Sequence, residues 1–402
     1  MEEEAQLNRR NRAWSPPGQL LRGAIIVAMA ALLFGCSPSA TEPALLEIEL
    51  LVRTVGLELD ADGYSFTIDA QPSLSLPSNG TVQLPPITPG SHAFQILGVA
   101  ANCRVTNGTT SGTFNATASQ TILQLDVFCL KENPGTIYYT TAFQSIRVLS
   151  ALGGEAQELP VLGNSVSPTD DGERIAYDSG GDIWAADANG LNPVNLTNTS
   201  NFIEARPQWS PDGLAILYHG VDQLGSSQLD VFRMNADGSG VTNLTPDTPS
   251  FADGEPDWSP DGTKIVFRSE RTGTGDLYTM NADGSDVVRL TEGDFDTSPK
   301  WSPDGQLIVF GRFLDPFILG TDGTDYELFV INADGTGLTQ LTRDPGFRTS
   351  EADWSPDGDW LVIGSGNLNF GGRYDLYSMR PDGTDLIQLT SGERAGLPTW
   401  IR

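Results

Sequence analysis

Acidic side chains recur at one fixed place in this chain, and this recurrence is the first candidate for chemistry. Glu204, Asp253 and Asp296 each stand five residues before a tryptophan. If the fold gathers equivalent positions around one axis, the three carboxylates could hold a cation or act in pairs as acid and base on a sugar. Both alternatives stay open. Most other aspartates occupy turn positions, where local hydrogen bonding selects them.

A second acidic group has the spacing of an EF-hand calcium loop. Its members are Glu58, Asp60, Asp62, Gly63 and Asp69. The stretch from Tyr64 to Ile68 alternates as a strand, whereas an EF-hand loop must run into a helix. We therefore interpret Asp62-Gly63 as a hairpin turn. No cofactor is expected, and a structural Ca²⁺ is the alternative.

Other catalytic groups are scarce. The chain has two histidines, His92 and His219, and lacks a Gly-x-Ser-x-Gly motif, so a Ser-His-Asp hydrolase has little to work with. His92 follows a Pro-Gly turn, which predicts a position at the surface or at a strand edge. The formal net charge of −29 would repel the phosphates of nucleic acid and argues against a nucleic-acid partner. We expect a non-enzymatic protein.

Residues 1–36 have the features of an export signal. Arginines precede an apolar run, residues 24–34, that is too short to span a bilayer. The run ends in Leu-Leu-Phe-Gly-Cys, which resembles the lipobox of bacterial lipoproteins and implies that Cys36 becomes the lipidated first residue. An ordinary secretory signal or an uncleaved anchor is the alternative. Ser37 favours the outer membrane, so we expect a lipid-anchored protein of the cell envelope that faces the periplasm or the cell surface.

Two cysteines remain after the signal. Cys103 and Cys129 make an even number in an exported chain, which predicts a disulfide. A metal site is not expected there, because neither histidine lies at ligand spacing from these cysteines.

The elements that must position these groups are set by one repeated pentapeptide, Trp-Ser-Pro-Asp-Gly. It recurs roughly every 43 to 53 residues, which is the period of propeller blades. Serine, proline, aspartate and glycine in this order match a type I turn between two strands. The copies begin at Trp209, Trp258, Trp301 and Trp354, with a degenerate copy at residues 166–172 and a truncated one ending at Trp400.

A second unit follows each turn. It consists of an acidic residue with an alternating strand, a tight turn such as Asn281–Gly284, and a short strand that closes on Leu-Thr. Each repeat is therefore interpreted as four antiparallel strands, which make one blade. The first blade lacks its inner strand, and residues 397–402 can supply it to residues 135–160, closing a ring of six blades.

The residues before the repeats have a different pattern. Residues 37–44 form a Ser/Pro/Ala/Thr tether. Residues 45–131 show period-two strands broken by Gly, Pro and Asn, which predict a small β-sandwich. The stretch from Ile87 through Pro89-Gly90 to Cys103 resembles the PEGA-like or Ig-like modules of bacterial surface proteins.

The repeats themselves carry a family resemblance. Trp-Ser-Pro-Asp-Gly, Ile-x-Phe, Asp-Leu-Tyr, Asn-Ala-Asp-Gly and Leu-Thr are similar to the β-propeller repeats of TolB, the periplasmic component of the Tol–Pal system. The resemblance covers roughly residues 135–402 and implies an all-β chain in which a six-bladed TolB-like propeller, residues 132–402, follows the sandwich. The amino-terminal part departs from TolB, which carries an α/β domain there.

Binding is expected on the propeller face opposite the regular turns, where loops of irregular length gather. Aromatic side chains beside charges suit contact with a protein or a glycan. Glu204, Asp253 and Asp296 would ring the axial channel there, and the alternative for the phenylalanines is packing between adjacent blades. The predicted face comprises Phe202, Glu204, Arg206, Phe251, Asp253, Glu255, Phe295, Asp296, Phe313, Phe317, Phe347, Arg348, Arg373 and Arg394.

These observations predict a monomeric envelope lipoprotein whose propeller is a protein-protein interaction scaffold. Its partner would be an envelope protein or peptide, or alternatively a glycan. A polysaccharide lyase or hydrolase acting at the central depression is the competing interpretation, and a purely architectural role is the third.

Overall fold

The computed structural model divides into two compact units, Met1–Asn133 and Pro134–Arg402. The structure describes residues 45–56, 63–69, 71–100, 103–105, 110–117, 122–129, 135–222, 228–246, 252–292, 295–314, 326–343, 347–367 and 373–401. These residues form strands and turns without a helix, so the predicted all-β class is confirmed. The signal with Cys36 and the calcium candidates Glu58, Asp60 and Asp62 lie outside the described residues.

Across those described ranges, no helix combines the length and the apolar character that crossing a membrane requires.

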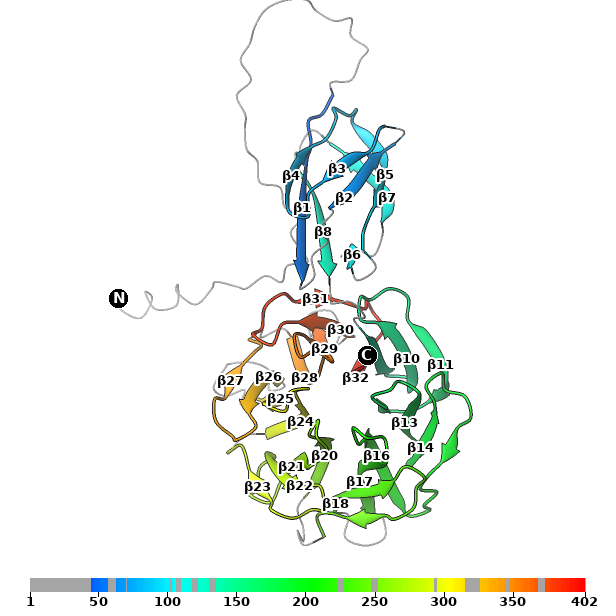
Figure 1. Cartoon of the computed structure of the whole chain (residues 1–402), viewed down its shortest axis with the longest axis vertical. Coiled ribbons are helices and arrows are strands. Elements are labelled where there is room, and N and C mark those ends of the chain that lie inside the picture. Colours follow the sequence, from blue (N-terminus) through cyan, green and yellow to red (C-terminus); the bar gives the residue numbers. More distant parts are fainter. Residues whose placement is uncertain are drawn as a thin grey trace, which may run out of the picture. The chain divides into compact units, whose positions relative to one another are not determined.

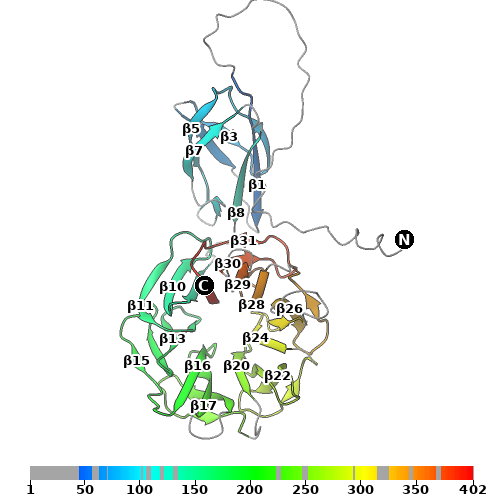
Figure 2. The same ribbon diagram turned by 180° about the vertical axis from the view of Figure 1, so that it is seen from behind.

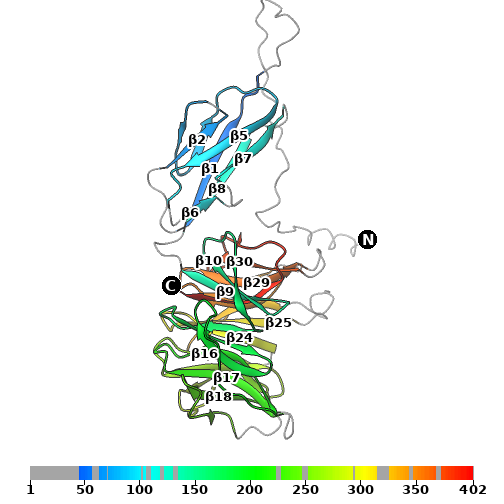
Figure 3. The ribbon, with the colours of Figure 1, turned by 90° about the vertical axis from the view of Figure 1, so that its right-hand side faces the viewer.

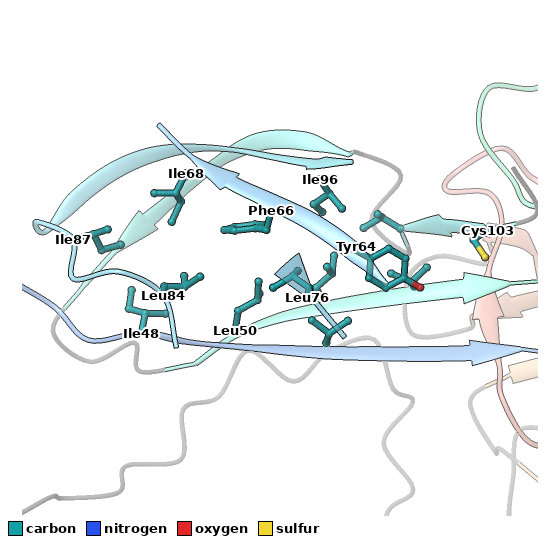
Figure 4. Close-up of a cluster of buried hydrophobic side chains, with 14 of the residues drawn as sticks. Ile48, Leu50, Tyr64, Phe66, Ile68, Leu76, Leu84, Ile87, Ile96 and Cys103 are labelled. Carbon is teal, nitrogen blue, oxygen red and sulfur yellow. The ribbon is translucent and has the colours of Figure 1, made fainter. Parts of the chain in front are cut away.

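The first unit is built from two four-stranded sheets, ordered β4-β1-β8-β6 and β3-β2-β5-β7. One buried cluster draws side chains from both sheets, among them Leu50 of β1 and Phe66 of β2 (Figure 4). The side chains of Tyr64, Phe66 and Ile68 alternate inward, as their spacing predicts. The strands are β1 (Glu49–Gly56), β2 (Tyr64–Ile68), β3 (Leu74–Leu76), β4 (Gly80–Gln83), β5 (Gly90–Leu97), β6 (Cys103–Val105), β7 (Ser111–Ala116) and β8 (Ile122–Cys129).

The predicted disulfide is confirmed. Cys103 of β6 and Cys129 of β8 are direct partners in the antiparallel register and are bonded to each other. Their separation of 26 residues in sequence makes the bond worth about 3 kcal/mol in the chain-entropy view. The bond therefore ties the three-residue strand β6 to the edge of its sheet.

His92 differs from its predicted position at a surface or strand edge, because it is only 7% exposed. Its two ring nitrogens lie 2.7 Å from the Asp69 carboxylate and 2.7 Å from the carbonyl oxygen of Thr88. A charged imidazolium can donate to both acceptors. The hydrogen bonds that His92 donates to Asp69 and Thr88 therefore raise the pKa of His92, and the bond from His92 lowers the pKa of Asp69.

We expect this pair to make the stability of the first unit depend on pH. The raised pKa of His92 means that its contribution is full below the ordinary value of 6.5 and is lost as the pH rises through the folded-state value. The lowered pKa of Asp69 means that its contribution is present above 3.8 and is lost at lower pH. Hydrogen exchange of the β2 and β5 amides in the full chain measures this, with His92→Gln as the comparison. Equal pH profiles for the two proteins would contradict the assignment.

The second unit is a ring of six four-stranded sheets, as far as its described residues show. Figures 1 and 2 show the sheets around a common axis, and Figure 3 shows the ring from the side. The strands of the first three sheets in chain order are β9 (Thr136–Thr141), β10 (Ser145–Ser150), β11 (Gln157–Leu162), β12 (Val166–Pro168), β13 (Arg174–Ser179), β14 (Asp182–Asp187), β15 (Val194–Asn195), β16 (Phe202–Trp209), β17 (Ala215–Asp222), β18 (Leu229–Asn235) and β19 (Thr242–Asn243).

The remaining sheets repeat this inner-to-outer order. Their strands are β20 (Asp253–Trp258), β21 (Lys264–Ser269), β22 (Asp276–Asn281), β23 (Val288–Arg289), β24 (Phe295–Trp301), β25 (Leu307–Phe313), β26 (Tyr326–Asn332), β27 (Thr339–Gln340), β28 (Phe347–Trp354), β29 (Leu361–Asn367), β30 (Arg373–Met379) and β31 (Ile387–Gln388). The last strand, β32 (Ala395–Ile401), joins the first sheet and gives it the order β11-β10-β9-β32.

Local chemistry explains why each inner strand stops where it does. In the turn after Trp258, the Ser259 hydroxyl donates to Asp261 at 2.6 Å and accepts the backbone N–H of Lys264 at 2.9 Å. Gly262 has φ +68°, a conformation that glycine adopts without a steric penalty. The turn therefore fixes where the first strand of a blade ends and the second begins.

Candidate functional site

The inner strands share an irregularity just before the tryptophan. Their register shifts between Ala205 and Gln208 in β16, and shifts at the matching place occur in β20, β24, β28 and β32. Such a bulge bends a strand and re-aims its side chains. The residue three positions before the tryptophan has φ between 47° and 54° in four strands, at Arg206, Glu255, Ser298 and Leu397. Positive φ at residues other than glycine costs about 1–3 kcal/mol each and is concentrated at functional sites.

These bulged residues meet at the centre of the ring. They line a cavity of about 40 Å³ together with Glu351 and with Ser165 of the degenerate repeat. Because the lining comes from all six sheets, the cavity lies on the axis. We call this set the axial ring: Ser165, Arg206, Glu255, Ser298, Glu351 and Leu397.

A larger cavity of about 450 Å³ lies next to the first, toward the Trp-Ser-Pro-Asp-Gly turns. Its wall includes the turn tryptophans and prolines, and two of those prolines, Pro260 and Pro303, are exposed, so the cavity opens to solvent. We call it the funnel. Its floor is the set of residues directly before the tryptophans and their counterparts: Ser167, Gln208, Asp257, Lys300, Asp353 and Thr399. Three of these, Gln208, Lys300 and Thr399, also line the smaller cavity, which places the floor between the two.

Arg206 connects blades across the axis. Its guanidinium lies 3.8 Å from Glu255 and 3.7 Å from Glu351, and it donates to the Ser298 hydroxyl at 3.1 Å. Burial alone would raise the pKa of Glu255, but Arg206 and hydrogen bonds from Ser298 and Thr297 outweigh it and lower the pKa. The axial ring therefore places the Arg206 guanidinium between the carboxylates of Glu255 and Glu351.

His219 supports this ring from the neighbouring strand. Its Nδ1 accepts the backbone N–H of Glu255 at 3.1 Å. Burial, followed by the positive charge of Arg206, lowers the pKa of His219 to about 4. The imidazole is therefore neutral at physiological pH and acts as a hydrogen-bond acceptor here.

The funnel floor contains two aspartates and one lysine. Asp257 accepts the Lys300 ammonium at 2.9 Å and the backbone N–H of Trp301 at 2.9 Å. Asp353 accepts the backbone N–H of Trp400 at 3.0 Å and the backbone N–H of Trp354 at 2.9 Å. Burial raises the pKa of Asp257, although Lys300 opposes it. Burial also raises the pKa of Asp353 to about 6. The positive charge of Lys300 lowers this pKa, and the negative charge of Asp257 raises it further.

The three carboxylates predicted to ring the axis lie elsewhere, and this expectation is corrected. Glu204 accepts the Thr199 hydroxyl at 2.7 Å, and Asp253 lies 3.2 Å from the Arg271 guanidinium. Asp296 forms two bonds with Arg312. The three are between 0 and 3% exposed and line neither cavity.

The bulge explains the difference, because it aims the residue two positions further along the chain at the axis. In the described ranges, no group of three or more His, Cys, Asp or Glu side chains could hold a metal ion.

The predicted aromatic residues are distributed unevenly. Phe202 is half-buried and packs edge-on against Phe232 at 5.7 Å. Phe295 is 50% exposed, and its ring centroid lies 6.0 Å from that of Phe313. The Phe313 centroid lies in turn 5.3 Å from that of Tyr326. Phe202 therefore packs against a strand of its own blade, while Phe295 belongs to a surface ladder with Phe313 and Tyr326.

The remaining predicted residues are described in part or not at all. Phe251 and Phe317 lie outside the described residues. Phe347, Arg348 and Arg373 lie in β28 and β30, but their side chains are outside the description. The Arg394 guanidinium lies 5.9 Å from the ring centroid of Phe143. Whether these residues form one binding face stays a prediction.

Sequence reasoning missed the funnel floor and most of the axial ring. A signal was present, because four of the five segments before a tryptophan read x-Pro-x-Trp and the fifth is Glu351-Ala352-Asp353-Trp354. A proline inside a strand indicates a bulge or an edge. The residues on either side of that proline are those that face the two cavities.

The comparisons with known proteins agree with this fold. A family model described as TolB beta propeller domain matches residues 229–315. TolB from Acinetobacter baumannii has a TM-score of 0.54 at 19% identity, over 78% of this chain and 80% of that one. A putative TolB from Agrobacterium tumefaciens has a TM-score of 0.50 at 21% identity, over 64% and 88%.

A third solved structure, of a nidogen/laminin complex, has a TM-score of 0.52 at 12% identity, over 67% of this chain and 99% of that one. No curated protein matches the chain. At these identities the structures show the fold alone, and with the repeat model matched over residues 229–315 they support a TolB-like β-propeller fold.

Proposed function

We propose that this protein is a non-enzymatic interaction scaffold of the cell envelope whose propeller receives a segment of a protein partner in the funnel. The observation that carries the proposal is the funnel itself, a cavity of about 450 Å³ that opens on the axis. Its volume falls within the range of about 300–1,000 Å³ that is usual for ligand sites. A chain segment of a few residues fits such a space, whereas a folded domain does not.

The lining of the funnel suits recognition of a polypeptide. Its tryptophans are 4–8% exposed, so they offer edges and a rigid frame, while the floor supplies carboxylates, an ammonium and an amide. Polar groups held at the base of a rigid hollow fix the orientation of what enters it. The solved nidogen/laminin complex, which has a similar fold, gives further support for protein binding.

The same proposal includes the place of the protein in the cell. The lipobox-like segment ending at Cys36 supports a lipid anchor in the outer membrane, facing the periplasm or the cell surface. A monomeric propeller held in this way would meet envelope proteins or peptides. A glycan is the other class of ligand that this location offers.

The test is an affinity pull-down from cross-linked envelope fractions with two variants. Gln208→Trp fills the funnel from its floor, and Phe202→Ala/Phe295→Ala alters the opposite end of the inner strands. We expect Gln208→Trp to reduce the captured partner at least about tenfold, since a blocked pocket loses the contacts at its centre. The phenylalanine variant should capture it normally.

The two variants separate the possible sites. Loss of the partner only with the phenylalanine variant would move the site to the predicted irregular face. Normal capture by both folded variants would contradict binding through either end. Unfolding midpoints of each variant establish that the ring is intact.

A polysaccharide lyase or hydrolase is the second candidate, and one observation favours it. Asp257 and Asp353 share the funnel floor, and burial raises the pKa of both carboxyl groups. A carboxyl group with a raised pKa is what a general acid needs. Against this role, both carboxylates already accept tryptophan N–H groups, and the Lys300 ammonium already forms an ion pair with Asp257. If the natural protein cleaves a polysaccharide and the Asp353→Asn variant does not, this result would favour an enzymatic function.

A further inference from the structure

The funnel floor repeats one structural unit twice, and the second copy lacks a part. In each copy an aspartate accepts the backbone N–H of the tryptophan in the next blade, Trp301 for Asp257 and Trp400 for Asp353. Directly before Trp301 stands Lys300, whose ammonium lies 2.9 Å from Asp257. Directly before Trp400 stands Thr399, which brings no positive charge. The first copy therefore shows how an ammonium sits beside the Asp257 carboxylate. In the second copy, the chain supplies no lysine at the matching position beside Asp353.

We propose that the funnel recognises a basic side chain, a lysine or an arginine carried by the partner segment, and that Asp353 is the residue that selects it. This inference rests on the proposed function, because it names what the partner places in the funnel. Asp353 lines the funnel and is partly exposed. Its carboxylate accepts two backbone N–H groups, and it does not form the direct ion pair that Asp257 forms with Lys300.

The charges around the funnel favour the same ligand. The charged residues that line it are Asp170, Asp257, Lys300 and Asp353, three carboxylates against one ammonium. The axial ring beneath adds two carboxylates, Glu255 and Glu351, against the single Arg206. A hollow lined mainly by one sign of charge concentrates the opposite sign and repels its own. A partner's carboxylate or phosphate is therefore disfavoured at the floor.

The protonation of Asp353 adds a property that a test can use. Besides burial, the charged groups that act on this carboxyl are Lys300 and Asp257, and its pKa is raised to about 6. A basic group docking beside it favours the ionised form and lowers that pKa. Binding therefore releases a proton and strengthens as the pH rises through 6.

The experiment selects displayed random peptides on the immobilised full chain at pH 7.5 and physiological salt. We expect the selected peptides to share one lysine or arginine. Asp353→Asn, which keeps an oxygen acceptor for Trp400, should weaken the best peptide at least about tenfold, because one partner of a desolvated charge pair is removed. Glu155→Gln is the matched control, since it makes the same change of net charge at an exposed position outside the funnel.

Two further variants make the outcome decisive. Thr399→Lys copies the Asp257–Lys300 pair onto Asp353 and should exclude the basic peptide as strongly as Gln208→Trp does. Wild-type affinity should fall about tenfold from pH 7.5 to pH 5, because protonation removes the carboxylate below its pKa of about 6. The affinity of Asp353→Asn should stay level over this range.

Different results overturn different claims. If norleucine replaces the basic residue of the selected peptide without loss, while Gln208→Trp still abolishes binding, the charge selection is wrong and the funnel site stands. If Thr399→Lys leaves binding unchanged, Asp353 is not the selecting residue. If Gln208→Trp leaves every selected peptide bound, the funnel is not the site and the proposed function fails with it.

Discussion

Deletion of residues 395–402 is expected to abolish the cooperative unfolding of the propeller. Residues 395–401 form β32, which pairs with β9 from Ala395 opposite Thr141 to Ile401 opposite Thr136. The strand also buries Trp400 to 4% exposure. Loss of one buried tryptophan side chain costs about 3–5 kcal/mol, and a domain has about 5–15 kcal/mol in total. Removing the whole strand therefore consumes most of the stability and leaves β9 as an open edge.

The closure also involves the segment before β32. The Tyr139 hydroxyl of β9 donates to Glu393, and Arg147 of β10 lies 3.3 Å from the same carboxylate. Burial, followed by the hydrogen bond to Glu393, raises the pKa of Tyr139, so this hydroxyl stays protonated as a donor. Urea unfolding of the full chain, followed by tryptophan fluorescence, measures the effect of the deletion.

A rearranged chain provides the control for this deletion. Ile401 lies opposite Thr136, so residues 395–402 inserted directly before Gly135 can enter β9 through a short hairpin. This variant has the composition of the natural chain, and we expect it to regain a cooperative transition. If the deletion variant unfolds at the natural urea midpoint, the shared sheet contributes no stability and our account of the closure is wrong.

The fold could be predicted because its information is local. The turn after Trp258 ends β20 and starts β21 through bonds among Ser259, Asp261 and Lys264, all within a few residues. The same turn can be predicted wherever these residues recur in this order. The all-β class and the TolB-like repeats were therefore predicted from the sequence, and both are confirmed. The disulfide was predictable for a different reason, since the two cysteines that follow the predicted signal allow one pairing.

The site could not be predicted with the same certainty, because its geometry depends on distant residues. Arg206 meets Glu255 and Glu351 only when blades far apart in sequence close into a ring. His92 was placed at the surface because its partner Asp69 lies 23 residues away. The offset of five residues before the tryptophan selected Glu204, Asp253 and Asp296, but the bulge assigns the axis to the offset of three.

Replacing Asp296 with alanine is expected to destabilise the propeller by about 3–5 kcal/mol, which is the usual cost of removing one partner from a buried ion pair. Asp296 is 0% exposed, and Arg312 holds it through two bonds of 2.6 and 2.9 Å. The alanine would leave a guanidinium that is only 8% exposed without this carboxylate. Urea unfolding measures the loss. Glu270→Ala is the control, because its pair with Arg268 is more exposed and should be worth less than about 1 kcal/mol.

A double variant separates the cost of leaving Arg312 without Asp296 from the value of the pair. Arg312 lies 5.4 Å from the Phe310 ring and 5.1 Å from the Phe329 ring, so a methionine there keeps an apolar stem against both. Asp296→Ala/Arg312→Met should therefore recover at least half of the loss, since replacing both charges of a buried pair is often neutral. Partner capture by the folded single variant should be normal, because Asp296 lines neither cavity. A variant of full stability that loses its partner would instead return Asp296 to the binding surface. Carboxylates at one offset of a repeat would then hold the scaffold together and contact the partner as well.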